Sequence, residues 1–146
     1  MLLREVFSTV APFSWTEQSP DAYEAEFMVE DAFYRVSFLL IKKEWYKSDF
    51  WNAQFIMVNG TTRDEEGNVG YGIEQTGNAG IVFGTVIQII KEFITKANPK
   101  LIKFEAKEPS RQKLYSRMLR LFRQPNWSVQ EILIKGAMAY VIKLSK

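Results

Sequence analysis

Residues 71–90 read YGIEQTGNAGIVFGTVIQII, and the period of the hydrophobic pattern changes within this stretch. Residues 69–75 have the pattern of a short strand, and residues 76–80 form a turn that contains two glycines. After the turn, apolar residues recur at helical spacing: Val82, Val86, Ile89 and Phe93. Asn98-Pro99 predicts the end of this helix, because proline disfavours helical geometry in the preceding residue. The stretch therefore predicts strand, turn and helix in succession.

The pattern on either side of this stretch predicts further strands and one more helix. Apolar residues that alternate or run together predict strands at 23–29, 33–43, 51–58, 101–106, 127–134 and 137–144. Strand 33–43 is expected to be central and covered on both faces, because Leu39 and Ile41 lie opposite its main apolar set. A second helix is expected to begin at Ser110, acting as the N-cap, and to end at Gln124-Pro125-Asn126.

The predicted elements define a fold class. Residues 1–20 are expected to form an irregular arm packed on the body, because Pro12 and Pro20 interrupt them. The rest gives the order β-β-β-β-α-β-α-β-β. This order predicts an α+β fold in one domain over residues 1–146. Its sheet would be mixed, mostly antiparallel and of about 6–7 strands, with two main helices.

Composition limits the chemistry open to the chain. Its 146 residues include no cysteine and no histidine, which excludes disulfides, thiolate nucleophiles, a Ser-His-Asp triad and metal sites built on these residues. Acid–base chemistry must therefore use Asp, Glu, Tyr, Lys, a chain terminus or water. We expect no metal, because the acidic loop at 64–66 lacks the spacing of a calcium loop. We also expect a cytoplasmic protein without a membrane partner, because no apolar run approaches the roughly 18 residues of a membrane span.

The net charge of +2 hides an uneven distribution. Residues 1–90 hold 6 Lys/Arg and 13 Asp/Glu, whereas residues 91–146 hold 13 and 4. Cations gather around the second predicted helix: Lys107, Arg111, Lys113, Arg117, Arg120 and Arg123. They suit phosphate contacts, or they balance the acidic strands that carry Glu24, Glu26 and Glu30. We expect the second, and no nucleic-acid partner, because no RNA-recognition string or helix-turn-helix signature accompanies them.

Gly77 and Gly80 precede the first predicted helix, where a backbone turn can hold a phosphate. A helix N-terminus exposes unpaired N–H groups and positive potential, and glycine lets the backbone approach an anion closely. Alternatively, the two glycines only turn the chain. The residues alone leave both interpretations open.

From its second strand onward, the order of elements resembles that of the GNAT-type N-acyltransferases. In that family a strand and a Q/R-x-x-G-x-G/A turn lead into a helix; here the turn is Gln75-Thr76-Gly77-Asn78-Ala79-Gly80, with Asn78 at the position of the middle glycine. The resemblance implies that acetyl-CoA or another acyl-CoA binds through Gln75, Gly77, Asn78, Ala79 and Gly80. It leaves open whether the fourth and fifth strands, at 69–75 and 101–106, separate to leave a slot for the pantetheine arm or stay paired and closed. The resemblance covers roughly residues 23–146, and the family's first two helices are missing.

The resemblance also implies two catalytic residues. The family's fifth strand is followed by a helix with a tyrosine, and Leu114-Tyr115 occupies that place here. Tyr115 would be the general acid that protonates the leaving thiolate. Glu74, at the end of the fourth predicted strand, would take the proton of the amine directly or through water. The other interpretations are a core or boundary tyrosine and a solvated glutamate.

A second resemblance is to small uncharacterised proteins of tailed bacteriophages. It rests on the strings at 82–87, 102–106 and 110–115. It implies a phage-type protein in the host cytoplasm, without implying a chemistry. The alternative to an acyltransferase, active or inactive, is thus a non-enzymatic interaction module acting on a host or phage protein. Four aromatic residues around one predicted loop would form a protein-interaction patch if they are exposed, or part of the core if they are buried: Trp45, Tyr46, Phe50 and Trp51.

Overall fold

The described part of the chain forms a seven-stranded sheet with two helices, an α+β fold. The structure is a computed structural model that describes residues 10–42, 49–59, 79–106, 109–121, 123–134 and 137–144. The strands are β1 (Phe13–Gln18), β2 (Ala22–Val29), β3 (Ala32–Ile41), β4 (Phe50–Asn59), β5 (Leu101–Ala106), β6 (Trp127–Ile134) and β7 (Ala137–Leu144). The helices are α3 (Ala79–Ala97) and α4 (Pro109–Leu121).

The strands lie in the order β1-β2-β3-β4-β5-β7-β6. Strands β4 and β5 are parallel, and every other pair of neighbours is antiparallel. A parallel pair needs a crossover connection, and α3 lies in the connection from β4 to β5. Helix α4 lies between β5 and β6 in the chain. In the sheet, β7 lies between β5 and β6.

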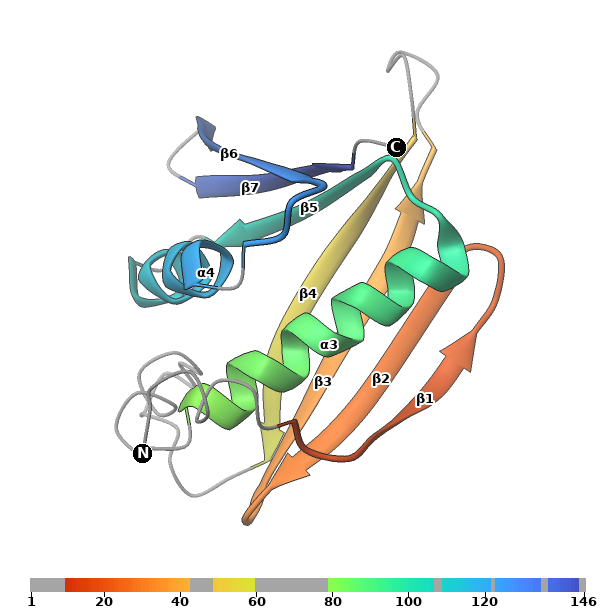
Figure 1. Ribbon diagram of the computed structural model, residues 1–146, viewed down its shortest axis with the longest axis vertical. Helices are drawn as coiled ribbons and strands as arrows, with labels where there is room; N and C mark the ends of the chain where they lie inside the picture. The colour runs from red at the N-terminus through yellow and green to blue at the C-terminus, as the bar shows by residue number, and fades with distance from the viewer. Residues whose placement is uncertain are drawn as a thin grey trace.

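Both helices cover the same face of the sheet (Figure 1). Register pairs Ala53 with Phe104, so Trp51 and Phe104 lie on one face of neighbouring strands. The Phe93 ring of α3 lies 4.9 Å from the Trp51 ring, and the Tyr115 ring of α4 lies 5.4 Å from the Phe104 ring. The hydrophobic core therefore lies between this face and the two helices.

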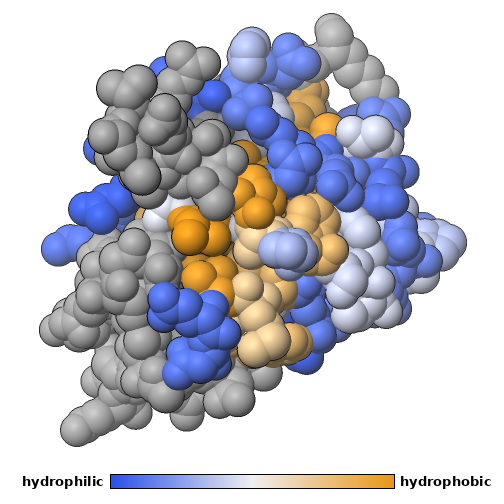
Figure 2. Space-filling model, turned by 60° about the horizontal axis from the view of Figure 1, so that its bottom comes forward, coloured by the Kyte–Doolittle hydropathy of each residue, from blue (hydrophilic) through white to orange (hydrophobic). Residues whose placement is uncertain are grey.

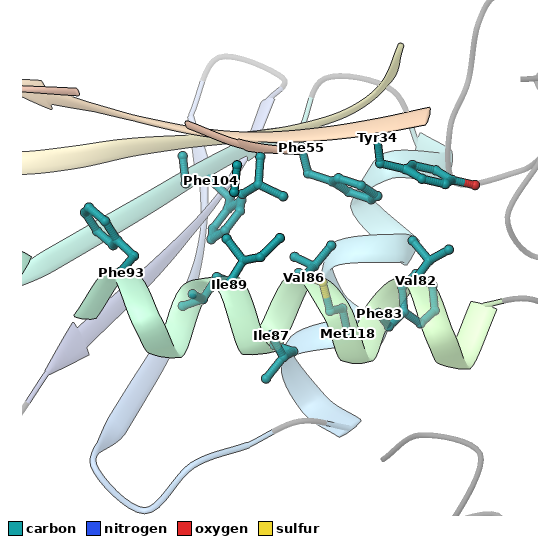
Figure 3. Close-up of a cluster of buried hydrophobic side chains, with 14 of the residues drawn as sticks. Tyr34, Phe55, Val82, Phe83, Val86, Ile87, Ile89, Phe93, Phe104 and Met118 are labelled. Carbon is teal, nitrogen blue, oxygen red and sulfur yellow. The ribbon is translucent and has the colours of Figure 1, made fainter. Parts of the chain in front are cut away.

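Helix α3 is buried on more than one side. Figure 3 shows Val82, Val86 and Phe93 on the side that faces the sheet, whereas Ile87 points away from it. Ile87 is nevertheless only 3% exposed. The helix ends where it was predicted to end, because Asn98 adopts a positive φ of 49° and its N–H bonds to the Ile94 carbonyl at 2.9 Å.

The face opposite the helices exposes apolar side chains. Met28 is 54% exposed and Leu39 is 52% exposed, so the expectation that β3 is covered on both faces is wrong. Strand β3 is central in the sheet, but both described helices pack on its other side. At a different place, the end of the molecule at which the β2–β3 turn lies, hydrophobic residues gather at the centre of the surface, with hydrophilic residues to the right of them (Figure 2).

The expected irregular arm is wrong for residues 13–18, which form β1 and pair with β2. Phe13 and Trp15 are alternate residues of β1 and pack against the core. The strand pattern was missed because Pro12 and Pro20, which were expected to interrupt the segment, lie just outside it. The order of elements along the chain thus differs from the predicted one at its beginning. The predicted strand at 69–75 lies outside the described residues, and the described parallel neighbour of β5 is β4.

The second half of the chain follows its prediction more closely. Strands β6 and β7 begin and end at the predicted residues. Helix α4 begins at Pro109 rather than after Ser110, so the N-cap position falls on residue 108, outside the described residues. In the predicted aromatic cluster, Trp51 is a buried core residue, and Trp45 and Tyr46 lie outside the described residues.

Thr85 ties the chain before β1 to α3. The Ala11 N–H donates to Thr85 Oγ1 at 2.9 Å, and Oγ1 donates to the Ile81 carbonyl at 2.7 Å.

Replacing Thr85 with valine is expected to lower the free energy of unfolding by about 1–3 kcal/mol, because the buried Ala11 N–H loses its acceptor. Urea unfolding measures the loss. The exposed Thr95, whose hydroxyl bonds to the Lys91 carbonyl, is the control; Thr95→Val losing as much would refute the explanation.

Candidate functional site

The predicted phosphate-binding turn meets α3 at its first residues. The prediction that the turn extends to Gly80 is wrong: Ala79 and Gly80 are the first two residues of α3, and Gly80 is buried. Glu74, Gln75, Gly77 and Asn78 lie outside the described residues. The first turn of α3 carries no acidic side chain that would oppose an anion at the N-terminus of the helix.

Strands β4 and β5 are neighbours over only a short length. Their pairing joins Trp51, Asn52 and Ala53 of β4 to residues 102–104 of β5. Beyond Ala53, β4 continues to Asn59 beside β3, while the last two residues of β5 continue to pair with β7. Figure 1 shows the two strands diverging from this short contact toward the side where α4 lies. The described neighbours that separate are therefore β4 and β5, with β4 in the place expected for residues 69–75.

Tyr115 of α4 reaches the diverging part of β4. Its hydroxyl donates to the Phe55 carbonyl, two residues beyond the last residue of β4 that pairs with β5, at 3.4 Å. The ring lies 5.4 Å from Phe104 on β5 and 6.0 Å from Tyr140 on β7. Tyr115 is 1% exposed and belongs to the hydrophobic core. The residue thus joins α4 to three strands.

Tyr140 is a second buried tyrosine beside α4. Its hydroxyl donates to the Gln112 carbonyl at 2.6 Å. Burial, followed by the negative charge of Glu131 and the nearby Tyr115, raises the pKa of Tyr140 from 10.0 to about 12. Burial, with Asp31 and Glu30 adding to it, raises the pKa of Tyr34 to the same value.

These shifts predict how stability depends on pH. The folded state holds the phenol protons of Tyr34 and Tyr140 more tightly than the unfolded state does. Their contribution to the free energy of unfolding is therefore complete below pH 10 and is lost as pH rises from 10 to 12. Urea unfolding at several pH values should show this fall, and Tyr140→Phe should make it shallower. The prediction would be contradicted if the absorbance of tyrosinate showed that every tyrosine of the folded protein ionises near pH 10.

A groove separates α4 from β6 and β7. One part, of about 640 Å³, is lined by Gln112, Lys113, Ser116, Arg117, Arg120, Glu131, Met138 and Tyr140. A second part, of about 520 Å³, is lined by Ser116, Leu119, Arg120, Arg123, Val129 and Glu131. Ser116 Oγ donates to Glu131 Oε1 at 2.8 Å and accepts from Arg120 at 3.3 Å. We call both parts together the α4–β6 groove.

The expected balance between the basic helix and the acidic strands is wrong for the side chains that the structure describes. Glu24 and Glu26 lie on β2 and form ion pairs with Arg35 of β3, at 3.5 and 3.1 Å. These side chains alternate with the core residues of β2, so they lie on the face opposite the helices. Lys113, Arg117 and Arg120 of α4 instead line the α4–β6 groove. Sequence reasoning missed Glu131 and Tyr140 there, because only the strand order β5-β7-β6 brings them to α4.

Comparisons with known proteins add no family. No protein-family model matches the chain, and the search of curated proteins gave no significant match. Neither described helix is both long and apolar enough to cross a membrane. In the same residues, no group of three acidic, histidine or cysteine side chains is placed to hold a metal ion.

Proposed function

We propose that the chain binds an acyl-coenzyme A and transfers the acyl group to an amine, as the GNAT-type N-acyltransferases do. The observation that carries the proposal is the divergence of β4 from β5 after three paired residues, with the Tyr115 hydroxyl against the diverging part of β4. A strand pair that separates in this way offers backbone N–H and C=O groups to an extended, amide-containing ligand. The pantetheine arm of coenzyme A is such a ligand.

Two further features support the same site. Helix α3 lies in the connection between the two parallel strands, and the sequence Gln75–Gly80 runs into its first residues. A pyrophosphate held there would receive N–H donors and the positive end of the helix dipole. Helix α4 follows β5 and carries Tyr115, in the order that the resemblance implies.

The chemistry assigned to these residues is a single acyl transfer. The amine nitrogen attacks the thioester carbonyl, the new amide bond forms, and the C–S bond breaks. Glu74, directly or through water, takes the proton lost by the amine, and the Tyr115 hydroxyl gives its proton to the departing thiolate. Solvent then reprotonates Tyr115. Because its hydroxyl is buried, the bound arm must displace the contact with the Phe55 carbonyl.

That same burial favours a second candidate, a non-enzymatic interaction module. A tyrosine in the core between α4 and three strands stabilises the fold without any substrate. In this case the α4–β6 groove, and not the diverging parts of β4 and β5, would be the functional surface.

Calorimetric titration with coenzyme A and acetyl-CoA separates the two candidates. We expect saturable heat and a rise in melting temperature, since a ligand that binds only the folded state stabilises it. Dephospho-CoA and free pantetheine are matched probes, which report whether the phosphates or the arm supply the affinity. No heat and no thermal shift at millimolar coenzyme A would overturn the acyl-transfer proposal.

A further inference from the structure

Strand β6 is an edge of the sheet with apolar side chains exposed on both faces. Its inner side pairs with β7 from Trp127 to Ile134, and the described strand order ends at β6. Leu133 is 66% exposed and Ile132 is 41% exposed, and successive residues of a strand point to opposite faces. Edge strands are commonly protected by lysine, proline or a bulge, but β6 has a regular register and Glu131 as its one charged residue.

A row of cations runs along this edge strand. Arg123 and Arg120 share the part of the α4–β6 groove that contains Val129, near the beginning of β6. Lys113 and Arg117 share the part that contains Met138, and Met138 is the register partner of Leu133. The row therefore extends from Val129 of β6 to Met138 of β7, the neighbour of Leu133 across the strand pair.

The part of the row on α4 is similar in length to the strand segment beside it. Lys113 to Arg120 spans about 10 Å along a helix, and Val129 to Leu133 spans about 13 Å along a strand. The groove lining holds four cations and one acid, Glu131, a difference of three positive charges. Side chains on one face of an extended chain recur about every 6.6 Å, close to the spacing of successive cations on a helix face.

We propose that β6 and the α4–β6 groove bind an extended peptide with acidic residues at alternate positions, which adds to the sheet as a further strand beside β6. Its main chain pairs with the edge of β6, and its acidic side chains on the helix side face the cations of α4. Its other contacts cover Leu133 and Ile132. Strand addition of this kind draws affinity from the main chain and specificity from alternate side chains.

The groove fits a peptide better than a nucleic acid. Single-stranded nucleic acids are usually held by exposed aromatic rings on which their bases stack. The one aromatic residue in the described lining is Tyr140, which is 2% exposed. A phosphodiester backbone has no N–H groups to pair with an edge strand and no apolar side chains to cover the exposed leucine and isoleucine. Nothing in this surface depends on coenzyme A.

Fluorescence anisotropy with labelled probes tests the proposal. The probe is a short synthetic peptide that alternates glutamate and threonine, and its controls are the same peptide with glutamine for glutamate and an oligothymidylate of equal charge. With the unchanged protein, we expect saturable binding of the glutamate peptide, and at least about tenfold weaker binding of both controls. Two further peptides carry N-methyl groups at alternate residues, one at the odd and one at the even positions (the two phases). At least one of them should fail to bind, because strand pairing needs the N–H groups on one edge.

The protein variant is Arg117→Glu with Arg120→Glu, and the matched control is Lys91→Glu with Lys100→Glu, which changes net charge equally at exposed sites outside the groove. We expect at least a tenfold loss of affinity in the first variant and less than about a twofold loss in the second. No saturable binding, equal losses in both variants, oligothymidylate bound as tightly as the peptide, or binding that tolerates both N-methylated phases would each overturn the proposal. The probe comparisons need no substitution, so a variant that fails to fold does not remove the test.

Discussion

Replacing Phe93 with alanine is expected to lower the free energy of unfolding by about 3–5 kcal/mol. Phe93 is fully buried and stacks on Phe38 of β3, with ring centroids 3.9 Å apart and planes 5° apart. It also contacts Tyr23 of β2 and Trp51 of β4, edge to face. Its removal leaves a cavity between α3 and three strands. Since domains of this size are stable by only about 5–15 kcal/mol, a large part of the stability depends on this ring.

Urea unfolding followed by tryptophan fluorescence measures the effect. Leu39→Ala is the control, because Leu39 is a large apolar residue of the same sheet that is 52% exposed on the opposite face. We expect it to cost less than about 1 kcal/mol. Equal losses in the two variants would show that α3 does not pack on the sheet through Phe93.

The acyl-transfer proposal predicts that Tyr115→Phe lowers the turnover of acetyl-CoA by at least about a hundredfold and leaves its affinity nearly unchanged, since a general acid acts in the transition state. The loss of stability should be small, about 0.5–1.5 kcal/mol, because the bond to the Phe55 carbonyl is long at 3.4 Å. Thiol release in the presence of a mixture of small amines measures turnover, and calorimetry measures affinity.

Tyr140→Phe is the matched control for this experiment. Tyr140 is also buried beside α4, but its hydroxyl bonds to the Gln112 carbonyl at 2.6 Å instead of contacting β4. We expect it to cost at least as much stability and to leave turnover unchanged. If Tyr115→Phe loses stability but keeps full turnover, Tyr115 is a structural residue and the catalytic assignment fails.

Elements with a strong periodic pattern could be predicted from the sequence. Helix α3 followed from the spacing of Val82, Val86, Ile89 and Phe93, and its end followed from Asn98-Pro99. Strand β1 was missed because its alternation is short and lies between two prolines. The exposure of Leu39 was missed as well, because an apolar residue on a strand does not reveal whether a second layer covers it.

The candidate sites were harder to predict because they depend on strand order. Tyr115 could be singled out from its helix, but its contact with the Phe55 carbonyl spans sixty residues of sequence. Likewise, the cations around the second helix were recognised as a cluster and assigned to the wrong acids. Glu24 and Glu26 have a nearer partner in Arg35, and the return of β7 between β5 and β6 gives α4 a different neighbour.

The most direct test of the acyl-CoA proposal is an NMR titration of ring-labelled tyrosines with acetyl-CoA. Tyr115 lies beside the diverging part of β4, whereas Tyr23 lies among Trp15, Trp51 and Phe93, on the other side of the paired residues of β4. The proposal predicts a saturable shift of the Tyr115 resonance, lost in Tyr115→Phe, with Tyr23 unchanged. A saturable shift confined to other tyrosines, or no shift at millimolar acetyl-CoA, would contradict it.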